Sequence, residues 1–216
     1  MTFNRWENVT VRIGVFGGSF DPIHYGHLLL AEQCREQAEL DQVLFLPSSI
    51  SPFKENGPVA SKKNRLEMLS LALAGHTPFE ISLLETERGG ISYTVDTMRD
   101  LAAQMPNSEL FLLMGADTLQ GFPDWKEPAN ICSLAVPLVA SRPGIDTVNL
   151  EILAPYATPQ QMELIREHQI QTLQLDISSS DIRLRARQSK SIRYQLPRSV
   201  EKYIETKKLY QDKKKR

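Results

Sequence analysis

The chain has 216 residues, of which 41% are hydrophobic and 24% are charged, and its formal net charge is -1. This composition is typical of an ordinary folded protein, and it excludes wholesale disorder and a membrane protein. The small net charge excludes a general electrostatic attraction to nucleic acid, so a site for an anion has to be built locally. We expect a single domain over residues 1–216, with a frayed basic tail at about residues 211–216.

The two cysteines and the N-terminus favour a cytoplasmic protein. Cys34 and Cys132 lie far apart in the sequence and outside any pattern of zinc ligands, so we expect neither a disulfide framework nor a structural zinc site. The N-terminus has no signal-peptide core, and no segment approaches the roughly 20 apolar residues that cross a bilayer. We therefore expect neither a membrane nor a nucleic acid as a partner.

Short apolar segments alternate with longer segments of helical periodicity. This alternation predicts an α/β fold of the doubly wound, Rossmann-like kind, with helices flanking a parallel sheet and a helical segment at the C-terminus. We expect strands over residues 11–16, 43–47, 79–84, 109–114, 134–140 and 172–176. We expect helices over residues 24–39, 62–74, 94–104, 159–168 and 180–188, and a last helix after Pro197, which suits a first helical position.

Residues 47–61 are rich in proline and serine and also contain glycine and asparagine, a composition that neither a helix nor a strand tolerates for long. This composition predicts a loop. Because loops carry function more often than the elements that they connect, we expect a mobile loop beside a site.

The segment GGSFDPIHYGH, residues 17–27, follows the first strand and opens the first helix. In a doubly wound sheet, ligands bind beyond the carboxyl ends of the strands. Gly17 and Gly18 leave their backbone amides open to an anion. Asp21 and Pro22 are expected to form a turn that caps the helix.

His24 and His27 are three residues apart at a helix start, which places both imidazoles on one face. Gly26 between them removes a side chain that would obstruct a nucleotide. A zinc site is the alternative for this pair. We see no third ligand at a recognisable spacing, and we therefore expect no metal held by the protein itself.

With these residues in view, the segment from Gly17 to His27 resembles the HxGH signature of the nucleotidyltransferase superfamily. Further segments resemble, in order, the bacterial nicotinate-mononucleotide adenylyltransferase family: SYTVDT at 92–97, GAD at 115–117, PDW at 123–125 and ISSSDIR at 177–183. The resemblance covers almost the whole chain. It departs at Phe53, where the family commonly has the histidine of Ser-Pro-His-Lys, whereas Lys54 matches.

The resemblance implies transfer of AMP from ATP to nicotinate mononucleotide, giving deamido-NAD and pyrophosphate, with Mg²⁺ carried by the ATP phosphates. The implied catalytic residues are His24, His27, Lys54 and Arg183. For ATP we expect Gly17, Gly18, Ser19, Phe20, Gly26, Gly115, Asp117, Ile177, Ser178, Ser179 and Ser180. For the acceptor we expect Lys54, Tyr93, Thr94, Trp125, Lys126 and Arg142. The sequence leaves a purely structural role open for the three serines, Asp117, Tyr93, Trp125 and Arg142.

Two other functions stay open at this point. The histidine motif reports ATP chemistry and says little about the acceptor, so a sister transferase acting on nicotinamide mononucleotide or phosphopantetheine is the nearest alternative. Trp125 and Tyr93 favour a pyridine ring. A nucleotide-binding sensor without catalysis is the alternative from a different class. The sequence also leaves open whether the chain forms a homo-oligomer.

Overall fold

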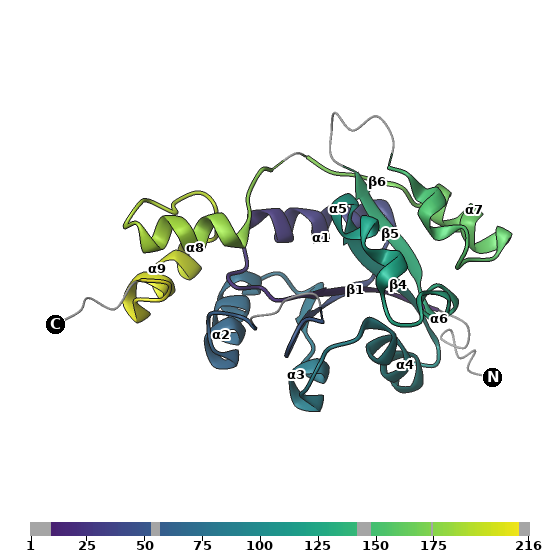
Figure 1. Cartoon of the computed structure of the whole chain (residues 1–216), viewed down its shortest axis with the longest axis horizontal. Helices are drawn as coiled ribbons and strands as arrows, with labels where there is room; N and C mark the ends of the chain where they lie inside the picture. The colour runs from purple at the N-terminus through teal and green to yellow at the C-terminus, as the bar shows by residue number, and fades with distance from the viewer. Residues whose placement is uncertain (1–9, 53–56, 142–147, 174, 212–216) are drawn as a thin grey trace, which may run out of the picture.

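The computed structural model describes residues 10–52, 57–141, 148–173 and 175–211. Six parallel strands form one sheet with helices on both faces (Figure 1). Their order is β3-β2-β1-β4-β5-β6, which confirms the doubly wound prediction, and the order switches between β1 and β4. The strands are β1 (Val11–Gly18), β2 (Gln42–Pro47), β3 (Phe79–Ile81), β4 (Ser108–Gly115), β5 (Val136–Ser141) and β6 (Ile170–Gln171).

The strands are apolar almost throughout because the sheet is buried on both faces. In β2, Val43 and Phe45 join one hydrophobic core, and Leu44 and Leu46 join the other. The first core contains side chains of α1 (Tyr25–Gln37), α2 (Lys62–Leu73), α8 (Ser179–Arg187) and α9 (Arg198–Lys207). The second contains those of α4 (Thr94–Gln104), α5 (Ala116–Gln120), α6 (Pro128–Leu134) and α7 (Pro159–Glu167).

Three short helical segments complete the described chain: α3 (Leu84–Arg88) and the 3₁₀ turns η1 (Phe122–Asp124) and η2 (Leu150–Leu153). Among the helices of the described residues, none has both the length and the apolar character that crossing a bilayer requires.

The closing helix packs on the body of the protein, as the sequence predicts. Val200 and Ile204 of α9 are buried in the core that α2 shares, and the Tyr203 hydroxyl donates to Asn64 Oδ1 at 3.0 Å. Figure 1 shows α8 and α9 together at the α2 side of the molecule. The helix begins at Arg198, after Pro197, as predicted; Pro197 itself has a ψ of 143° and is the N-cap, so its placing in the first helical position is wrong.

Two predicted strands have wrong boundaries. The strand expected over 79–84 ends at Ile81, because Ser82 Oγ accepts from the Leu84 amide and α3 begins there. The strand expected over 134–140 begins at Val136, since Leu134 ends α6.

The strand expected over 172–176 is wrong. Of the residues that the structure describes in this part of the chain, only Ile170 and Gln171 pair with β5. Leu173 and Leu175, which suggest a buried strand, are exposed and line a pocket instead.

Candidate active site

Two neighbouring pockets open at the carboxyl ends of β1 and β4, where the strand order switches. We call them the His24 pocket and the Trp125 pocket, after a residue that lines each. Both are lined by Phe16, Gly17, Gly115 and Thr118. Apart from the neighbours of Gly17 in the chain, no heavy atom of the described residues lies within 4 Å of the place where a Gly17 Cβ would stand, so the backbone there is open. Two ligands bound in the two pockets would therefore meet beside Gly17.

The His24 pocket is a cavity of about 380 Å³ that brings together three separate parts of the chain. They are the start of α1, the first turn of α5 and the segment that leads into α8. Besides Gly17 and Gly115, the expected ATP-side residues that line it are His24, Gly26, His27, Asp117, Ile177, Ser178 and Ser179. These segments meet because each begins a helix at the same edge of the sheet.

The two imidazoles lie face to face at the N-terminus of α1. Their ring centroids are 3.7 Å apart and their planes differ by 25°. His24 occupies the N-cap in an extended conformation, and its backbone N–H donates to His27 Nδ1 at 3.3 Å. Because His27 Nδ1 accepts this bond, the proton of the neutral ring sits on Nε2. His27 can therefore present a hydrogen-bond donor at its other nitrogen.

His24 is buried, and its Nδ1 has no hydrogen-bond partner within the described part of the chain. Burial lowers the pKa of the His24 imidazole to about 4, so the ring is neutral at pH 7. A Cβ at Gly26 would stand 3.1 Å from His24 Cε1 and Nδ1. The missing side chain at Gly26 thus makes room first for this imidazole, whereas the sequence suggests only room for a nucleotide.

The Asp21–Pro22 turn is held differently from the sequence prediction. Asp21 does not cap α1. Its buried carboxylate accepts from the backbone N–H groups of Val59 at 2.7 Å and Ala60 at 3.1 Å, and from the Tyr210 hydroxyl at 2.8 Å. The carboxylate instead joins the turn to Val59 and Ala60, near the far end of the 47–61 loop.

Side chains at the start of α8 also hold this turn. Arg183 Nη1 donates to the Asp21 carbonyl at 2.8 Å, and its Nη2 donates to Ser180 Oγ at 3.1 Å. Ser179 Oγ donates to the Pro22 carbonyl at 2.8 Å. Arg183 and Ser180 line neither pocket in this structure. Ser178 caps α8, since its Oγ accepts from the Asp181 amide at 3.0 Å, and it lines the His24 pocket as well.

The Trp125 pocket is a cavity of about 430 Å³ with an aromatic wall. Trp125 is half-buried and packs against Phe122, with a ring-centroid distance of 5.2 Å. Lys126 Nζ lies 4.8 Å from the centroid of the Tyr93 ring and pairs with Asp96. Tyr93, Thr94, Trp125 and Lys126, all expected on the acceptor side, line this pocket together, as do Gly18 and Ser19, which are expected on the ATP side.

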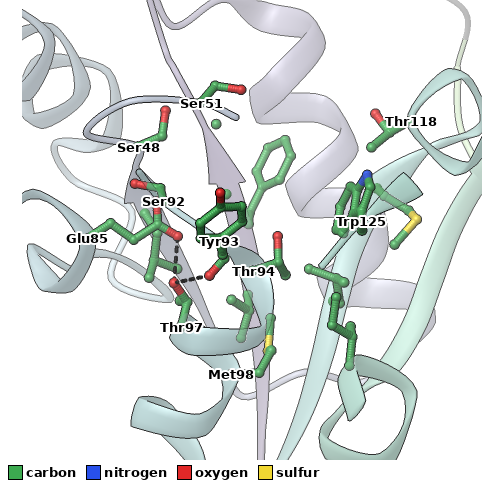
Figure 2. A pocket seen from close by; sticks show the side chains of 18 of the residues that line it. Ser48, Ser51, Glu85, Ser92, Tyr93, Thr94, Thr97, Met98, Thr118 and Trp125 are labelled. Carbon is green, nitrogen blue, oxygen red and sulfur yellow. Dashed lines mark hydrogen bonds between the residues drawn. The ribbon is translucent and has the colours of Figure 1, made fainter. Parts of the chain in front are cut away.

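The opposite wall of the Trp125 pocket is polar, and sequence reasoning missed it. Figure 2 shows Ser48, Glu85 and Ser92 across the pocket from Trp125. Ser48 is buried, and its Oγ has no hydrogen-bond partner within the described residues. A buried hydroxyl without a partner is costly, and here it faces a cavity that a ligand can fill.

Glu85 is the centre of a hydrogen-bond network on this wall. Thr97 Oγ1 donates to Glu85 Oε1 at 2.8 Å, and the Ser92 hydroxyl also bonds to the carboxyl group. Each hydroxyl oxygen accepts in turn, from Arg88 Nη2 and from the Ser49 amide respectively, both at 2.9 Å. Burial raises the pKa of Glu85, although both hydroxyl contacts oppose that shift. The Thr97 and Ser92 hydroxyls are thus left to donate to the carboxyl group, an arrangement that fits its ionised form.

Besides Ser180 and Arg183, three of the expected residues do not line the pockets or lie outside the described residues. Phe20 is buried at 1% exposure, and its ring packs behind His27 at a centroid distance of 5.2 Å. It contacts the imidazole from the core, and its backbone has a positive φ of 45°. Lys54 and Arg142 lie outside the described residues, as does Phe53.

Within the described ranges, no three His, Cys, Asp or Glu side chains gather in a way that would hold a metal ion. The carboxylate that lines the His24 pocket is Asp117, which is exposed in the first turn of α5. A divalent cation in this pocket would therefore take most of its oxygen ligands from a phosphorylated ligand and from water, as Mg²⁺ commonly does.

Comparison with known proteins places this geometry in a family. A family model described as cytidylyltransferase-like matches residues 15–185. A probable nicotinate-nucleotide adenylyltransferase of Rhodopirellula baltica is 41% identical over 198 residues and covers 92% of each chain. Another, of Desulfitobacterium hafniense strain Y51, is 42% identical over 199 residues, which are 92% of this chain and 95% of that protein.

A solved structure shares the fold at low sequence identity. It is the Plasmodium falciparum nicotinic acid mononucleotide adenylyltransferase complexed with NaAD, with a TM-score of 0.70 and 17% identity over 93% of this chain and 97% of that chain. The fold, the paired imidazoles at the switch point and the relatives that match over almost the whole chain agree. The protein belongs to the nicotinate-nucleotide adenylyltransferase family.

Proposed function

We propose that the protein transfers AMP from ATP to the phosphate of nicotinate mononucleotide, giving deamido-NAD and pyrophosphate in NAD biosynthesis. The observation that carries this proposal is the pair of pockets that meet at the open backbone of Gly17, with the stacked imidazoles in one of them. ATP would occupy the His24 pocket, and the acceptor would occupy the Trp125 pocket with its pyridine ring on the aromatic wall. The names of the relatives support this choice of acceptor.

The reaction needs alignment and positive charge more than it needs a base. The second pKa of a phosphomonoester is about 6, so most of the acceptor phosphate is already a dianion at pH 7. One of its oxygens attacks the α-phosphorus of ATP, the bond from that phosphorus to the β-bridging oxygen breaks, and pyrophosphate leaves. The protein holds the two reacting groups in line.

The imidazoles supply hydrogen-bond donors where negative charge gathers on the α-phosphate. His27 donates from Nε2, because its Nδ1 is occupied by the His24 amide. His24 enters the reaction as a neutral ring. A bound polyphosphate raises the pKa of His24 again, because it places negative charge beside the ring.

The N-terminus of α8 would hold the β- and γ-phosphates through its first amides and the hydroxyls of Ser178 and Ser179. Mg²⁺ bound by ATP would neutralise phosphate charge. Lys54 would reach the acceptor phosphate. We assign Arg183 first to holding the turn, because it reaches a phosphate only if its guanidinium leaves the Asp21 carbonyl and Ser180.

We expect the reaction to take place in the cytoplasm, where the free and buried thiols of Cys34 and Cys132 would stay reduced.

The choice of acceptor is tested by pyrophosphate release from ATP and Mg²⁺ with nicotinate mononucleotide, nicotinamide mononucleotide or phosphopantetheine. We expect the highest kcat/KM with nicotinate mononucleotide. A preference for phosphopantetheine would assign the protein to the sister activity instead. Release with none of the three would favour a nucleotide-binding sensor.

The role of the imidazole pair is tested by His27→Ala. Loss of one preorganised donor lowers kcat by about 10²-fold or more, since such donors contribute about 2.7 to 4 kcal/mol to the transition state. Circular dichroism and the melting temperature show whether the fold is intact. Normal turnover in this variant would remove His27 from the mechanism.

A further inference from the structure

The Asp21–Pro22 turn leads directly into His24 and α1, and we call residues 21–24 the histidine-bearing turn. It is held mostly from the C-terminal part of the chain. Arg183 and Ser179 hold its Asp21 and Pro22 carbonyls. The first amide of α1, that of Tyr25, donates to the Gln195 carbonyl at 3.0 Å. The position of the imidazoles therefore depends on residues that lie more than 150 positions later in the sequence.

Tyr210 is the last of these contacts. It follows α9, it is buried at 8% exposure, and its hydroxyl lies 2.8 Å from Asp21 Oδ1 and 3.9 Å from Met68 Sδ. Burial, reinforced by the charge of Asp21, raises the pKa of the Tyr210 hydroxyl, so it stays protonated and donates at any physiological pH. Neither Tyr210 nor Asp21 lines the two pockets.

Asp21 has few other ways to satisfy its charge. Within the described residues, its remaining donors are the Val59 and Ala60 amides, near the end of the 47–61 loop. The Arg65 guanidinium lies nearby, and its Nη1 is committed to the Ser19 carbonyl at 2.8 Å. A buried carboxylate that loses one of its donors has to shift toward another donor or toward water.

We propose that Tyr210 is a positioning residue for adenylyl transfer: through Asp21 it fixes the histidine-bearing turn and the end of the 47–61 loop relative to each other. This inference rests on the proposed function for its kinetic consequence. The contact with Asp21 is a feature of the fold and can be tested separately.

The variant Tyr210→Phe keeps the ring in the core and removes only the donor. We expect kcat to fall between about 10-fold and 10²-fold, because small displacements of catalytic groups have effects of this size. The KM values for ATP and nicotinate mononucleotide should change less than twofold, since Tyr210 touches neither pocket.

Tyr203→Phe is the matched control. Tyr203 lies in α9 and donates one hydroxyl hydrogen bond to Asn64 of α2, away from the turn. Both variants lose one hydrogen bond between the C-terminal part and the body. The melting temperature of Tyr203→Phe should fall by about 2–4 °C, and that of Tyr210→Phe by about 3–12 °C, because its lost bond goes to a buried carboxylate. Only Tyr210→Phe should lose turnover when both are assayed well below their melting temperatures.

A second measurement does not depend on activity. In spectra of isotope-labelled histidine, we expect the imidazole signals of His24 and His27 to shift in Tyr210→Phe and to stay in place in Tyr203→Phe. If the protein released no pyrophosphate with any acceptor, the proposed function would fail, and these signals alone would decide the inference.

If Tyr210→Phe does not fold, Asp21→Asn decides the same question. Either orientation of the new amide sets its NH₂ group against the Val59 or the Ala60 amide, so the same loss of kcat and the same histidine shifts are expected. The proposal is overturned by normal kcat in the folded variant, by an equal loss of kcat in Tyr203→Phe, or by unchanged histidine signals.

Discussion

Glu85→Gln tests whether the polar wall of the Trp125 pocket prepares that pocket for its ligand. The substitution keeps the size of the side chain and replaces one acceptor oxygen with a donor. Ser92 Oγ already accepts from the Ser49 amide, so its hydrogen has to point to residue 85. The NH₂ group of the new amide should therefore face Thr97. The Thr97 hydroxyl now donates to Glu85 Oε1 at 2.8 Å, and in the variant it has to donate to the Tyr93 carbonyl, which lies 3.4 Å from Thr97 Oγ1.

The cost of this exchange can be worked out from the contacts. A hydrogen bond to a charged group contributes about 1.5–3 kcal/mol, and a long neutral one contributes less. Replacing the Thr97–Glu85 bond by the long bond to the Tyr93 carbonyl therefore removes about 1–2 kcal/mol of the interaction that holds Thr97 and Tyr93 in place. Tyr93 lines the pocket, and we expect the KM for nicotinate mononucleotide to rise about 5- to 30-fold, the factor that corresponds to this energy. Global stability should change less, because the variant no longer buries a charge.

Steady-state pyrophosphate release, with ATP and acceptor varied in turn, measures this effect. The KM for ATP should stay within twofold, because Glu85 does not line the His24 pocket. Glu87→Gln is the control, since Glu87 lies in the same short helix and is exposed. If the acceptor KM of Glu85→Gln were unchanged, or if both KM values rose together, Glu85 would have no particular role in the acceptor pocket.

Two further predictions concern buried polar groups of the site. Ser48→Ala removes a buried hydroxyl that has no partner in the described chain, so the melting temperature should hold or rise by about 2–4 °C. Because Ser48 lines the Trp125 pocket, the KM for the acceptor should increase. A lower melting temperature with a normal KM would refute this prediction. For His24 the folded pKa of about 4 lies below the unfolded value of 6.5, so its contribution to stability is present above pH 6.5 and is lost as the pH falls toward 4. Across that pH window, the free energy of urea unfolding should therefore fall by about 3 kcal/mol more in the wild type than in His24→Gln. If the free energy of unfolding had the same pH dependence in both proteins, the assigned burial of His24 would be contradicted.

The sequence predicts the sheet well where strands are long and buried on both faces. β1, β2 and β4 are apolar nearly throughout, and their positions are correct to within two residues. The short helices α3, α5 and α6 have five to seven residues, too few to display helical periodicity, and the sequence does not reveal them. Leu173 and Leu175 mislead because leucines that line a pocket look like leucines of a core.

The site, like the fold, has features that the sequence predicts and features that it does not. The histidine pair and the Trp125 wall are predicted because each lies in one short segment with its own chemistry. The roles of Asp21 and Glu85 are not. The bonds of Asp21 reach residues 38 to 189 positions away, and local patterns contain no information on such contacts. Glu85 follows an apolar stretch that reads as a strand, so its burial beside a pocket has no local signal.

The 47–61 loop shows how these distant contacts serve the site. At its start, the Ser48 amide donates to the Gly18 carbonyl at 2.9 Å, and the Ser49 amide donates to Ser92 Oγ. At its end, the loop is bound to Asp21. It thus leaves from and returns to the turn that carries the histidines, and Lys54 lies between the two attachments in the sequence. Because backbone amides make these attachments, they do not depend on the side chain at position 53. The departure from the family's Ser-Pro-His-Lys therefore changes one side chain and leaves both attachments of the loop in place.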